Sequence, residues 1–483
     1  MARRALYISA LLLLSLLPAF SATTDDAATH FNQAVALYGN GLLNDALSEF
    51  QKAREASPKD SLICNWIGFI YLRQSKYQEA VDPLEQAVKL RPKYAEAYTN
   101  LGNAYLNVKR TDEAVTAFKK VIELEPTSTN AANAHYNLGN VFSKAAKYAD
   151  AIVEFTHAAK LNPTDAYIQN NLGVAYQESA RPDLAVAAYD KATHLSPKNS
   201  AFWLNLGLAN METRQYDKAR TAMAQSVKLD PANFYARISL GEALTRLKLD
   251  KEAIAQYEKA MTIKSDDYSV AFNLGMLYSR SGNSPKAIEC YRKAVQINGN
   301  SPEALNALGL LLFRNNQLDE SIRIFRRLTG VSQNDAAGWI NLGAVYTKKG
   351  EGQEAARAWE EALQRNGKRA DVRRWLAGYY LGTGDLDRAE QEYQRSIKVD
   401  ASSAEAYNGL GLIQDRRGNT DEAIKFYQKA ITVKPKYEFA WNNQGVAYEK
   451  KGQTEQAKIC YRKALALNPN YVDARKNLDR FKH

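Results

Sequence analysis

A unit of 34 residues recurs thirteen times in this chain, and no other feature constrains the fold as strongly. A glycine, usually preceded by leucine, marks each copy, and an alanine takes its place in two. The marking residues are Ala34, Gly68, Gly102, Gly139, Gly173, Gly207, Gly241, Gly275, Gly309, Gly343, Ala377, Gly411 and Gly445. Every step is 34 residues except that from Gly102 to Gly139, which is 37. A fixed period of this size predicts stacked copies of one supersecondary unit, and not the few ordinary domains that 483 residues would otherwise suggest.

Each unit predicts two helices. Leu172 and Tyr176 recur at helical spacing in a first helix with one apolar face. In a second helix, a small residue such as Ala185 lets the first helix approach, and a ring such as Tyr189 fills the groove between them. Between the two helices several copies carry glycine, which supplies a left-handed turn: Gly282, Gly350, Gly384, Gly418 and Gly452. Many copies close with proline, which cannot continue a helix: Pro58, Pro92, Pro126, Pro163, Pro197, Pro231, Pro435 and Pro469.

The motif Trp203-x-x-Leu206-Gly207, followed by Ala219 and Pro231, resembles the tetratricopeptide repeat family. The resemblance covers about Ala27 to Tyr471. It implies an all-α fold, a right-handed superhelical solenoid of about 13 helix-turn-helix repeats with a long concave groove. Gln444 and Ala377 depart from the motif, and the closing proline is missing from 265 to 401. These departures affect the tightness of turns and not the expected fold.

The chain is expected to divide into a signal peptide (1–21), a short tail (22–26), the solenoid of thirteen repeats (27–470) and a C-terminal capping helix (471–483). The three extra residues near 127–133 are expected to lengthen one loop.

The first residues predict export. Arg3 and Arg4 precede an apolar run from Ala5 to Leu17, and small residues after Pro18 suit cleavage before Ala22. The alternative is an uncleaved membrane anchor, but a membrane-spanning helix needs about 20 apolar residues and this run is shorter. The mature protein is therefore expected in the periplasm or outside the cell, with 62 basic and 53 acidic side chains and a net charge of about +9.

Asparagine recurs at one position of the first helix. With each repeat numbered 1 to 34 and the marking glycine at position 8, position 6 holds Asn32, Asn100, Asn137, Asn171, Asn205, Asn273, Asn341 and Asn443. Three further repeats have asparagine one residue earlier: Asn65, Asn306 and Asn408. The family resemblance places position 6 in the groove, and the array is similar to that of the superhelix of O-linked N-acetylglucosamine transferases, here without a catalytic domain. A side-chain amide can pair with both groups of a peptide backbone, so the asparagines at position 6, apart from Asn32, are candidates for holding an extended partner. The alternative is that asparagine at position 6 is generic to this repeat.

Position 13, which also lines the groove in the family, is often basic. It holds Arg73, Lys144, Arg246, Arg280, Arg314, Lys348, Arg416 and Lys450, whereas two repeats carry Glu178 and Glu212. Lys144, Arg280 and Lys348 are the candidates for binding an acidic partner segment. Alternatively, a cation in the last turn of a helix complements the helix dipole.

A denser basic group lies beside Trp375: Arg365, Lys368, Arg369, Arg373 and Arg374. Basic residues next to an aromatic ring are typical of nucleic-acid binding. The expected export argues against nucleic acid and favours a solvated surface.

No motif for catalysis is present. The sequence has no P-loop, no His-Glu-x-x-His and no Gly-x-Ser-x-Gly, and its five histidines have no metal-ligand spacing. The three cysteines are widely spaced and are expected to pack as small apolar side chains. We therefore expect no enzyme, no cofactor and no metal.

The expected function is that of an exported scaffold or adaptor, which binds an extended or helical segment of a protein or peptide partner in its groove. No nucleic-acid partner is expected, and contact with a membrane is expected only through a partner. Two alternatives remain open: a targeting subunit of a separately encoded envelope glycosyltransferase, and a structural component of an envelope assembly or secretion complex.

Overall fold

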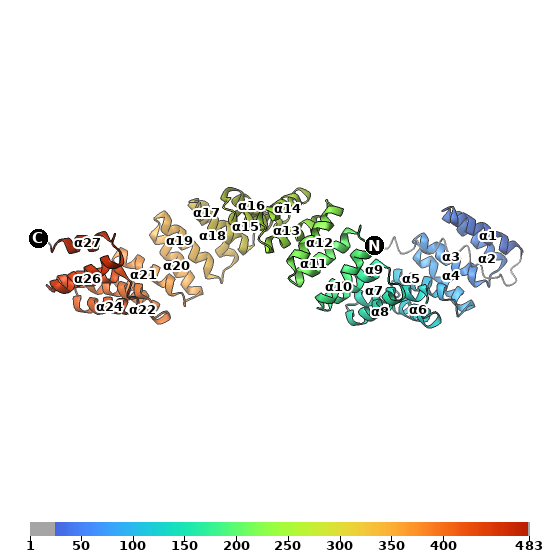
Figure 1. Cartoon of the computed structure of the whole chain (residues 1–483), viewed down its shortest axis with the longest axis horizontal. Coiled ribbons are helices and arrows are strands. Elements are labelled where there is room, and N and C mark those ends of the chain that lie inside the picture. Colours follow the sequence, from blue (N-terminus) through green and yellow to red (C-terminus); the bar gives the residue numbers. More distant parts are fainter. Residues whose placement is uncertain (1–24, 482–483) are drawn as a thin grey trace. The chain divides into compact units, whose positions relative to one another are not determined.

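Paired α-helices make up the whole of the described chain (Figure 1). The computed structural model describes residues 25–481, which hold 27 α-helices and no strand. They fall into two compact units, one ending at Ala253 and one beginning at Ile254, so that the division lies within α14. In each unit the chain alternates between the first and second helix of successive repeats, which confirms the predicted all-α architecture of helix pairs.

The helices of the first unit are α1 (Asp25–Gly39), α2 (Leu43–Ala56), α3 (Ser61–Arg73), α4 (Tyr77–Leu90), α5 (Ala95–Asn107), α6 (Thr111–Leu124), α7 (Thr129–Lys144), α8 (Tyr148–Leu161), α9 (Ala166–Glu178), α10 (Pro182–Leu195), α11 (Ser200–Glu212), α12 (Tyr216–Leu229) and α13 (Phe234–Arg246), with α14 (Asp250–Ile263) at the division. The helices of the second unit are α15 (Tyr268–Arg280), α16 (Ser284–Ile297), α17 (Pro302–Arg314), α18 (Leu318–Val331), α19 (Ala336–Lys349), α20 (Gly352–Arg365), α21 (Ala370–Thr383), α22 (Leu386–Val399), α23 (Ala404–Arg416), α24 (Thr420–Val433), α25 (Glu438–Lys450), α26 (Thr454–Leu467) and α27 (Val472–Asp479).

The turn inside each repeat is left-handed at position 15 in all thirteen repeats. Gly282 has φ of 78° there, as expected for glycine. Seven repeats place a side-chain-bearing residue at the same position, as Ala180 does with φ of 58°. In that turn the Arg181 amide donates to the Tyr176 carbonyl at 2.9 Å, which closes the end of α9. The turn geometry is therefore constant even where the residue is not suited to it.

The marking glycine at position 8 lies against the large side chain at position 24 of the same repeat. A Cβ built on Gly173 would lie 2.7 Å from the Tyr189 ring, and one on Gly309 would lie 2.7 Å from the Phe325 ring. Both rings are buried. The close packing of the first helix on the second therefore explains why glycine, a small residue and a ring recur in the sequence.

First helices of successive repeats also contact each other. In the first unit α3 contacts α5, α5 contacts α7, α7 contacts α9 and α11 contacts α13; in the second unit α17 contacts α19, α21 contacts α23 and α23 contacts α25. Second helices of neighbouring repeats make no contact of similar extent within residues 25–481. In a curved stack, neighbouring helices lie closer together in the layer on the inside of the curve than in the layer on the outside. The first helices therefore form the inner layer within each unit.

The three-residue insertion lengthens a helix and not a loop. The connection before α7 has four residues, as has the connection before α5, whereas α7 has 16 residues and α5 has 13. The expectation of a longer loop was wrong because the extra residues, among them Ala131 and Ala132, are compatible with helix and bury their side chains.

Two expectations concern the ends of the chain. The predicted signal peptide (1–21) lies outside the described residues. Within the part that is described, no helix has the length and apolarity needed to cross a membrane. At the other end, α27 packs against α26 and α25 within the segment predicted to cap the solenoid.

The glycine contact predicts opposite effects for two alanine substitutions in the same repeat. Gly309→Ala forces a Cβ into the buried Phe325 ring and should lower the free energy of unfolding by about 1–3 kcal/mol. Gly330→Ala, in α18, meets no atom within 4 Å and should leave stability unchanged or raise it by up to about 1 kcal/mol. Urea unfolding followed by circular dichroism measures both; equal midpoints for the two variants would contradict the packing argument.

Candidate functional site

The candidate site is the exposed side of the inner helix layer. Positions 2, 5, 6, 9 and 13 of a first helix lie on one side of it because they follow the helical period. We call this surface the first-helix face. In α9, Tyr167, Val174 and Glu178 occupy positions 2, 9 and 13 and are exposed, whereas Leu172 and Gly173 are buried.

The asparagines of the first-helix face form hydrogen bonds between repeats. In each bond the amide nitrogen at position 6 donates to the amide oxygen at position 5 of the preceding repeat, 35 residues earlier. The pairs are Asn100 to Asn65 (2.9 Å), Asn205 to Asn170 (2.8 Å), Asn341 to Asn306 (2.9 Å) and Asn443 to Asn408 (3.0 Å). Asn65, Asn100 and Asn408 are buried, and the other members are partly buried. These asparagines therefore connect neighbouring first helices.

The remaining candidate asparagines find other partners. Asn137 donates to the Asn103 amide oxygen at 3.1 Å, and Asn171 donates to the Asn140 amide oxygen at 2.9 Å. Asn273 donates to the Tyr257 hydroxyl at 3.4 Å. All seven candidates thus use an amide hydrogen inside the protein. Peptide binding by this ladder stays a prediction and would have to use the other amide hydrogen or the oxygen. At Asn171 these also have partners, because its nitrogen donates to the Tyr136 hydroxyl at 3.1 Å and its oxygen accepts from the Asn170 amide at 3.2 Å.

A sequence signal for this ladder exists and was missed. Every asparagine at position 5 is followed 35 residues later by asparagine: 65 and 100, 170 and 205, 306 and 341, 408 and 443, 442 and 477. Within a single repeat, asparagine at position 5 looks like a displaced version of position 6, whereas the two positions are acceptor and donor of one bond between repeats. The last pair, Asn477 to Asn442 at 3.1 Å, extends the ladder to α27.

The cations at position 13 reach back to the end of the preceding first helix. Lys348 donates to the Phe313 carbonyl at 3.4 Å, and its ammonium lies 5.0 Å from the centre of the Phe313 ring. Arg416 donates in the same way to the Leu381 carbonyl at 2.5 Å. Each therefore complements the carbonyl end of a neighbouring helix, as the dipole interpretation expects, but of the preceding helix and not its own. Lys144 and Arg280 are exposed at the ends of α7 and α15.

The two acidic residues at position 13 have a different environment. The Gln177 amide donates to the Glu212 carboxylate at 3.2 Å, and the Tyr189 hydroxyl donates to the Gln177 amide oxygen at 3.1 Å. Burial raises the pKa of Tyr189, and the negative charges of Glu178 and Glu212 raise it further. Both carboxylates are exposed and lie on the first-helix face.

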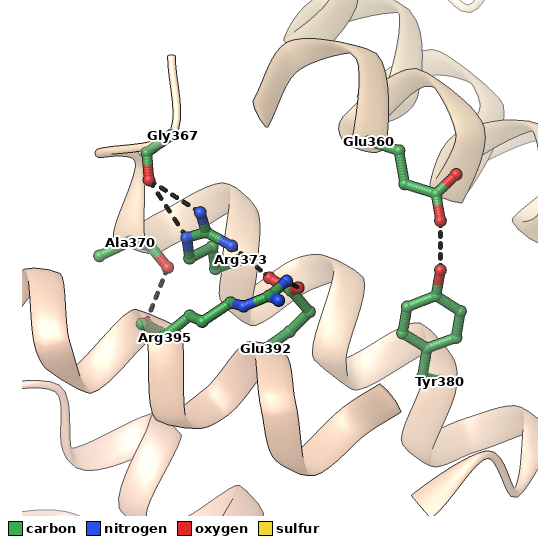
Figure 2. A network of polar contacts seen from close by, with 8 residues as sticks. Glu360, Gly367, Ala370, Arg373, Tyr380, Glu392 and Arg395 are labelled. Atoms are coloured by element: carbon green, nitrogen blue, oxygen red, sulfur yellow. Dashed lines mark hydrogen bonds and ion pairs between the residues drawn. The ribbon is translucent and has the colours of Figure 1, made fainter. Parts of the chain in front are cut away.

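Three of the five cations near Trp375 are paired within the protein, and Figure 2 shows the contacts of one of them, Arg373. Arg373 donates to the Gly367 carbonyl at 3.0 Å and to one oxygen of the Glu392 carboxylate at 2.5 Å, and Arg395 donates to the other oxygen at 2.5 Å. Arg369 forms a bidentate pair with Asp371 at 2.9 and 2.6 Å. Arg365 donates to the Gln333 carbonyl and to Glu361. These contacts give three of the five cations a structural role.

The Arg373–Glu392 pair belongs to a pattern that joins the two helices of one repeat. Position 4 and position 23 are also paired in His30–Glu49 and His135–Glu154, each with 2.6 Å between ring nitrogen and carboxylate oxygen. Where position 4 is apolar, as at Leu305, position 23 is apolar too, as at Ile324. Histidine or arginine at position 4 thus occurs with a polar residue at position 23, because a buried charge needs a partner, whereas the neutral Gln169 occurs with Ala188.

Six large exposed apolar side chains lie on the first-helix face within residues 25–481, and they were not predicted from the sequence. They are Tyr167, Val174, Leu208 and Tyr235 in the first unit, and Trp375 and Phe439 in the second. Tyr235 is 72% exposed and Trp375 43%. Their signal in the sequence is an apolar residue at position 2, 6 or 9, on the side of the helix that the packing within a repeat does not use.

Other kinds of site have less support. Among residues 25–481 no three His, Cys, Asp or Glu side chains converge as metal ligands. All three cysteines are free, and burial raises the pKa of Cys290 and Cys460 to about 11. Their thiols are therefore protonated at neutral pH and are poor nucleophiles.

Comparison with protein families finds tetratricopeptide repeats along most of the chain. One tetratricopeptide repeat model matches residues 95–128 and 439–471, and a second matches 136–200, 170–224, 204–268, 340–398 and 376–438. A TPR repeat model matches 68–108. The model of the cilia and flagella-associated protein 70 middle TPR-like domain matches 246–367. No curated protein matches the chain.

Solved structures resemble the chain at low identity. The crystal structure of YrrB, a TPR protein with an unusual peptide-binding site, is 23% identical; the match covers 41% of this chain and 100% of YrrB, with a TM-score of 0.35. A crystal structure of MamA is 26% identical over 35% of this chain and 93% of its own, with a TM-score of 0.33. The APC/C hetero-tetramer Cut9-Hcn1 is 12% identical over 99% and 98%, with a TM-score of 0.36.

The asparagine ladder predicts energetic coupling between repeats. Asn306→Ala and Asn341→Ala should each lower the free energy of unfolding by about 1 kcal/mol, and the double variant should lose less than the sum of the two, with a coupling of about 0.5–1.5 kcal/mol. Urea unfolding of the four proteins in the cycle measures this. Losses that simply add would show that the bond contributes nothing to stability.

The His30–Glu49 contact predicts a pH dependence. Hydrogen bonds from Lys52 and then His30 lower the pKa of Glu49 from its ordinary 4.5. Because the folded protein holds this proton less tightly than the unfolded chain, the carboxylate stabilises the fold above pH 4.5 and loses that effect as the pH falls through the folded-state pKa. The stability difference between wild type and Glu49→Gln should therefore shrink between about pH 5 and pH 3. Glu55→Gln, on the exposed side of the same helix α2, is the control, and a Glu49→Gln difference that is constant over this range would contradict the prediction.

Proposed function

Because the chain belongs to the tetratricopeptide repeat family, whose repeats serve as protein-interaction scaffolds, we propose that it binds an extended or helical segment of a partner protein along the first-helix face. The observation that carries this proposal is the set of exposed apolar side chains on that face, from Tyr167 and Val174 of α9 to Tyr235 of α13. Neighbouring exposed apolar side chains are typical of interaction surfaces.

The arrangement of the face supports a segment rather than a globular partner. The exposed apolar residues lie on successive first helices, where each repeat adds positions 2 and 9 to the same surface: Val174 and Leu208 are equivalent residues one repeat apart. A surface that repeats along the stack offers a row of similar contacts to one chain laid across several helices. The asparagine ladder then fixes the spacing of these contacts, since it joins α9 to α11 through Asn170 and Asn205.

We also propose that this scaffold acts after export, in the periplasm or outside the cell. The support is the sequence of residues 1–21 alone, with its two arginines, apolar run and small residues before Ala22. Mass spectrometry of the protein purified from the native cell tests it. A mature N-terminus at Ala22 is expected, and a retained Met1 or Ala2 in a cytosolic fraction would refute it.

Site-specific photocrosslinking tests the binding face. A photoreactive phenylalanine analogue is placed in the native cell at Tyr235 or Leu208, on the first-helix face, and at Val153 or Leu184, on second helices. All four side chains are apolar and exposed, so the two pairs differ in location and not in accessibility. We expect discrete partner adducts from Tyr235 and Leu208 in yields about tenfold above those from Val153 and Leu184, because proximity governs the reaction. Equal yields from both faces, or adducts from the second helices alone, would refute the proposal.

A further inference from the structure

The first-helix face of α9, α11 and α13 carries four of the six large exposed apolar side chains of that face. Tyr167 and Val174 on α9, Leu208 on α11 and Tyr235 on α13 are all exposed. The Tyr167 ring packs edge-on against Phe202 of α11, with 5.3 Å between ring centroids, and so is held in place. These residues belong to one unit, in which the Asn205–Asn170 hydrogen bond joins α11 to α9 and α11 contacts α13.

The charge of this stretch is opposite to that of the chain. Positions 2, 5, 6, 9 and 13 of the three helices carry three carboxylates, Glu178, Glu212 and Glu242, and one cation, Arg246. The net charge there is −2, in a chain whose net charge is +11. Position 13 is nowhere else acidic. A basic segment is therefore attracted to this stretch and repelled by much of the remaining surface.

An open hollow lies beside the carboxylates. It has a volume of about 590 Å³ and is lined by Met211, Glu212, Arg214, Tyr216, Glu242 and Arg246. Glu242 already has Arg246 at 3.6 Å, whereas the hydrogen bond to Glu212 within residues 25–481 comes from the neutral amide of Gln177. A long basic side chain can extend its methylene groups over Met211 and Tyr216 and bring its charge to Glu212.

We propose that this stretch of the face, from α9 to α13, binds a partner segment in which lysine or arginine alternates with apolar residues. The inference rests on the proposed function and names the chemistry of the segment. The apolar residues of the segment contact Val174 and Leu208, its cations pair with Glu178, Glu212 and Glu242, and the exposed faces of Tyr167 and Tyr235 accept a guanidinium or an apolar side chain.

Titration of two peptides tests the assignment. The full chain is added to fluorescein-labelled peptides of equal length, one alternating Leu and Arg and the other Leu and Glu, and binding is followed by fluorescence anisotropy. Undirected attraction to a protein of charge +11 would favour the acidic peptide. We expect the Leu-Arg peptide to bind about tenfold more tightly, and its affinity to fall with added salt.

Two matched triple variants locate the binding. Glu178→Gln with Glu212→Gln and Glu242→Gln should weaken the Leu-Arg complex about tenfold. Glu55→Gln with Glu123→Gln and Asp190→Asn removes the same charge from exposed sites on the second helices α2, α6 and α10, and should change the dissociation constant less than about twofold. Circular dichroism of both variants shows whether the fold is kept.

Three outcomes would overturn the inference: tighter binding of the Leu-Glu peptide, no binding of either peptide, or equal losses in the two triple variants. None of them decides the proposed function, because the crosslinks from Tyr235 and Leu208 report the native partner whatever its charge. Conversely, crosslinks confined to the second helices would refute the proposed function even if the Leu-Arg peptide bound.

Discussion

The close contact between the glycine at position 8 and the large side chain at position 24 sets the distance between the two helices of each repeat. A ring such as Tyr189 or Phe325 lies directly over the glycine, in the space that a Cβ would fill. The same contact orients the first helix, because the face with the glycine must point to the second helix. Positions 2, 5, 6, 9 and 13 are left on the other side, so the packing of each pair also determines which residues form the first-helix face.

Polar contacts then fix how one repeat sits on the next. An apolar interface alone permits helices to slide, whereas the bond from Asn341 to Asn306 or from Asn443 to Asn408 requires one register. Buried amides are costly when unpaired, so they favour the single arrangement that pairs them. The cations of position 13 also favour one register, since Lys348 and Arg416 each donate a hydrogen bond to a carbonyl of the preceding first helix.

The sequence predicts the helix pairs well, because glycine, small residue and ring recur with a fixed spacing that only one packing explains. It predicts the turns less well: Ala180 and Arg214 adopt the left-handed conformation that glycine takes elsewhere, since stacking on both sides determines the backbone there. The insertion near 127–133 could not be assigned to helix or loop by period alone. For the candidate site, the composition of position 6 was visible, but its role depended on a partner 35 residues earlier, a relation between repeats and not within one.

In a stack of this kind, the residues that pack the helices together differ from the residues that are exposed to a partner. Positions 4, 8, 20, 23 and 24 form the contacts within a repeat, and positions 5 and 6 form many of those between repeats, so substitutions there change stability. Positions 2 and 9 are exposed in α9, and position 13 is exposed in α9, α11 and α13, so they can vary without disturbing the packing within a repeat. Glu178 and Glu212 stand where other repeats have lysine or arginine, within the same helical frame. Each stretch of the first-helix face can therefore acquire its own charge and its own partner segment, because the repeats beneath it keep their packing.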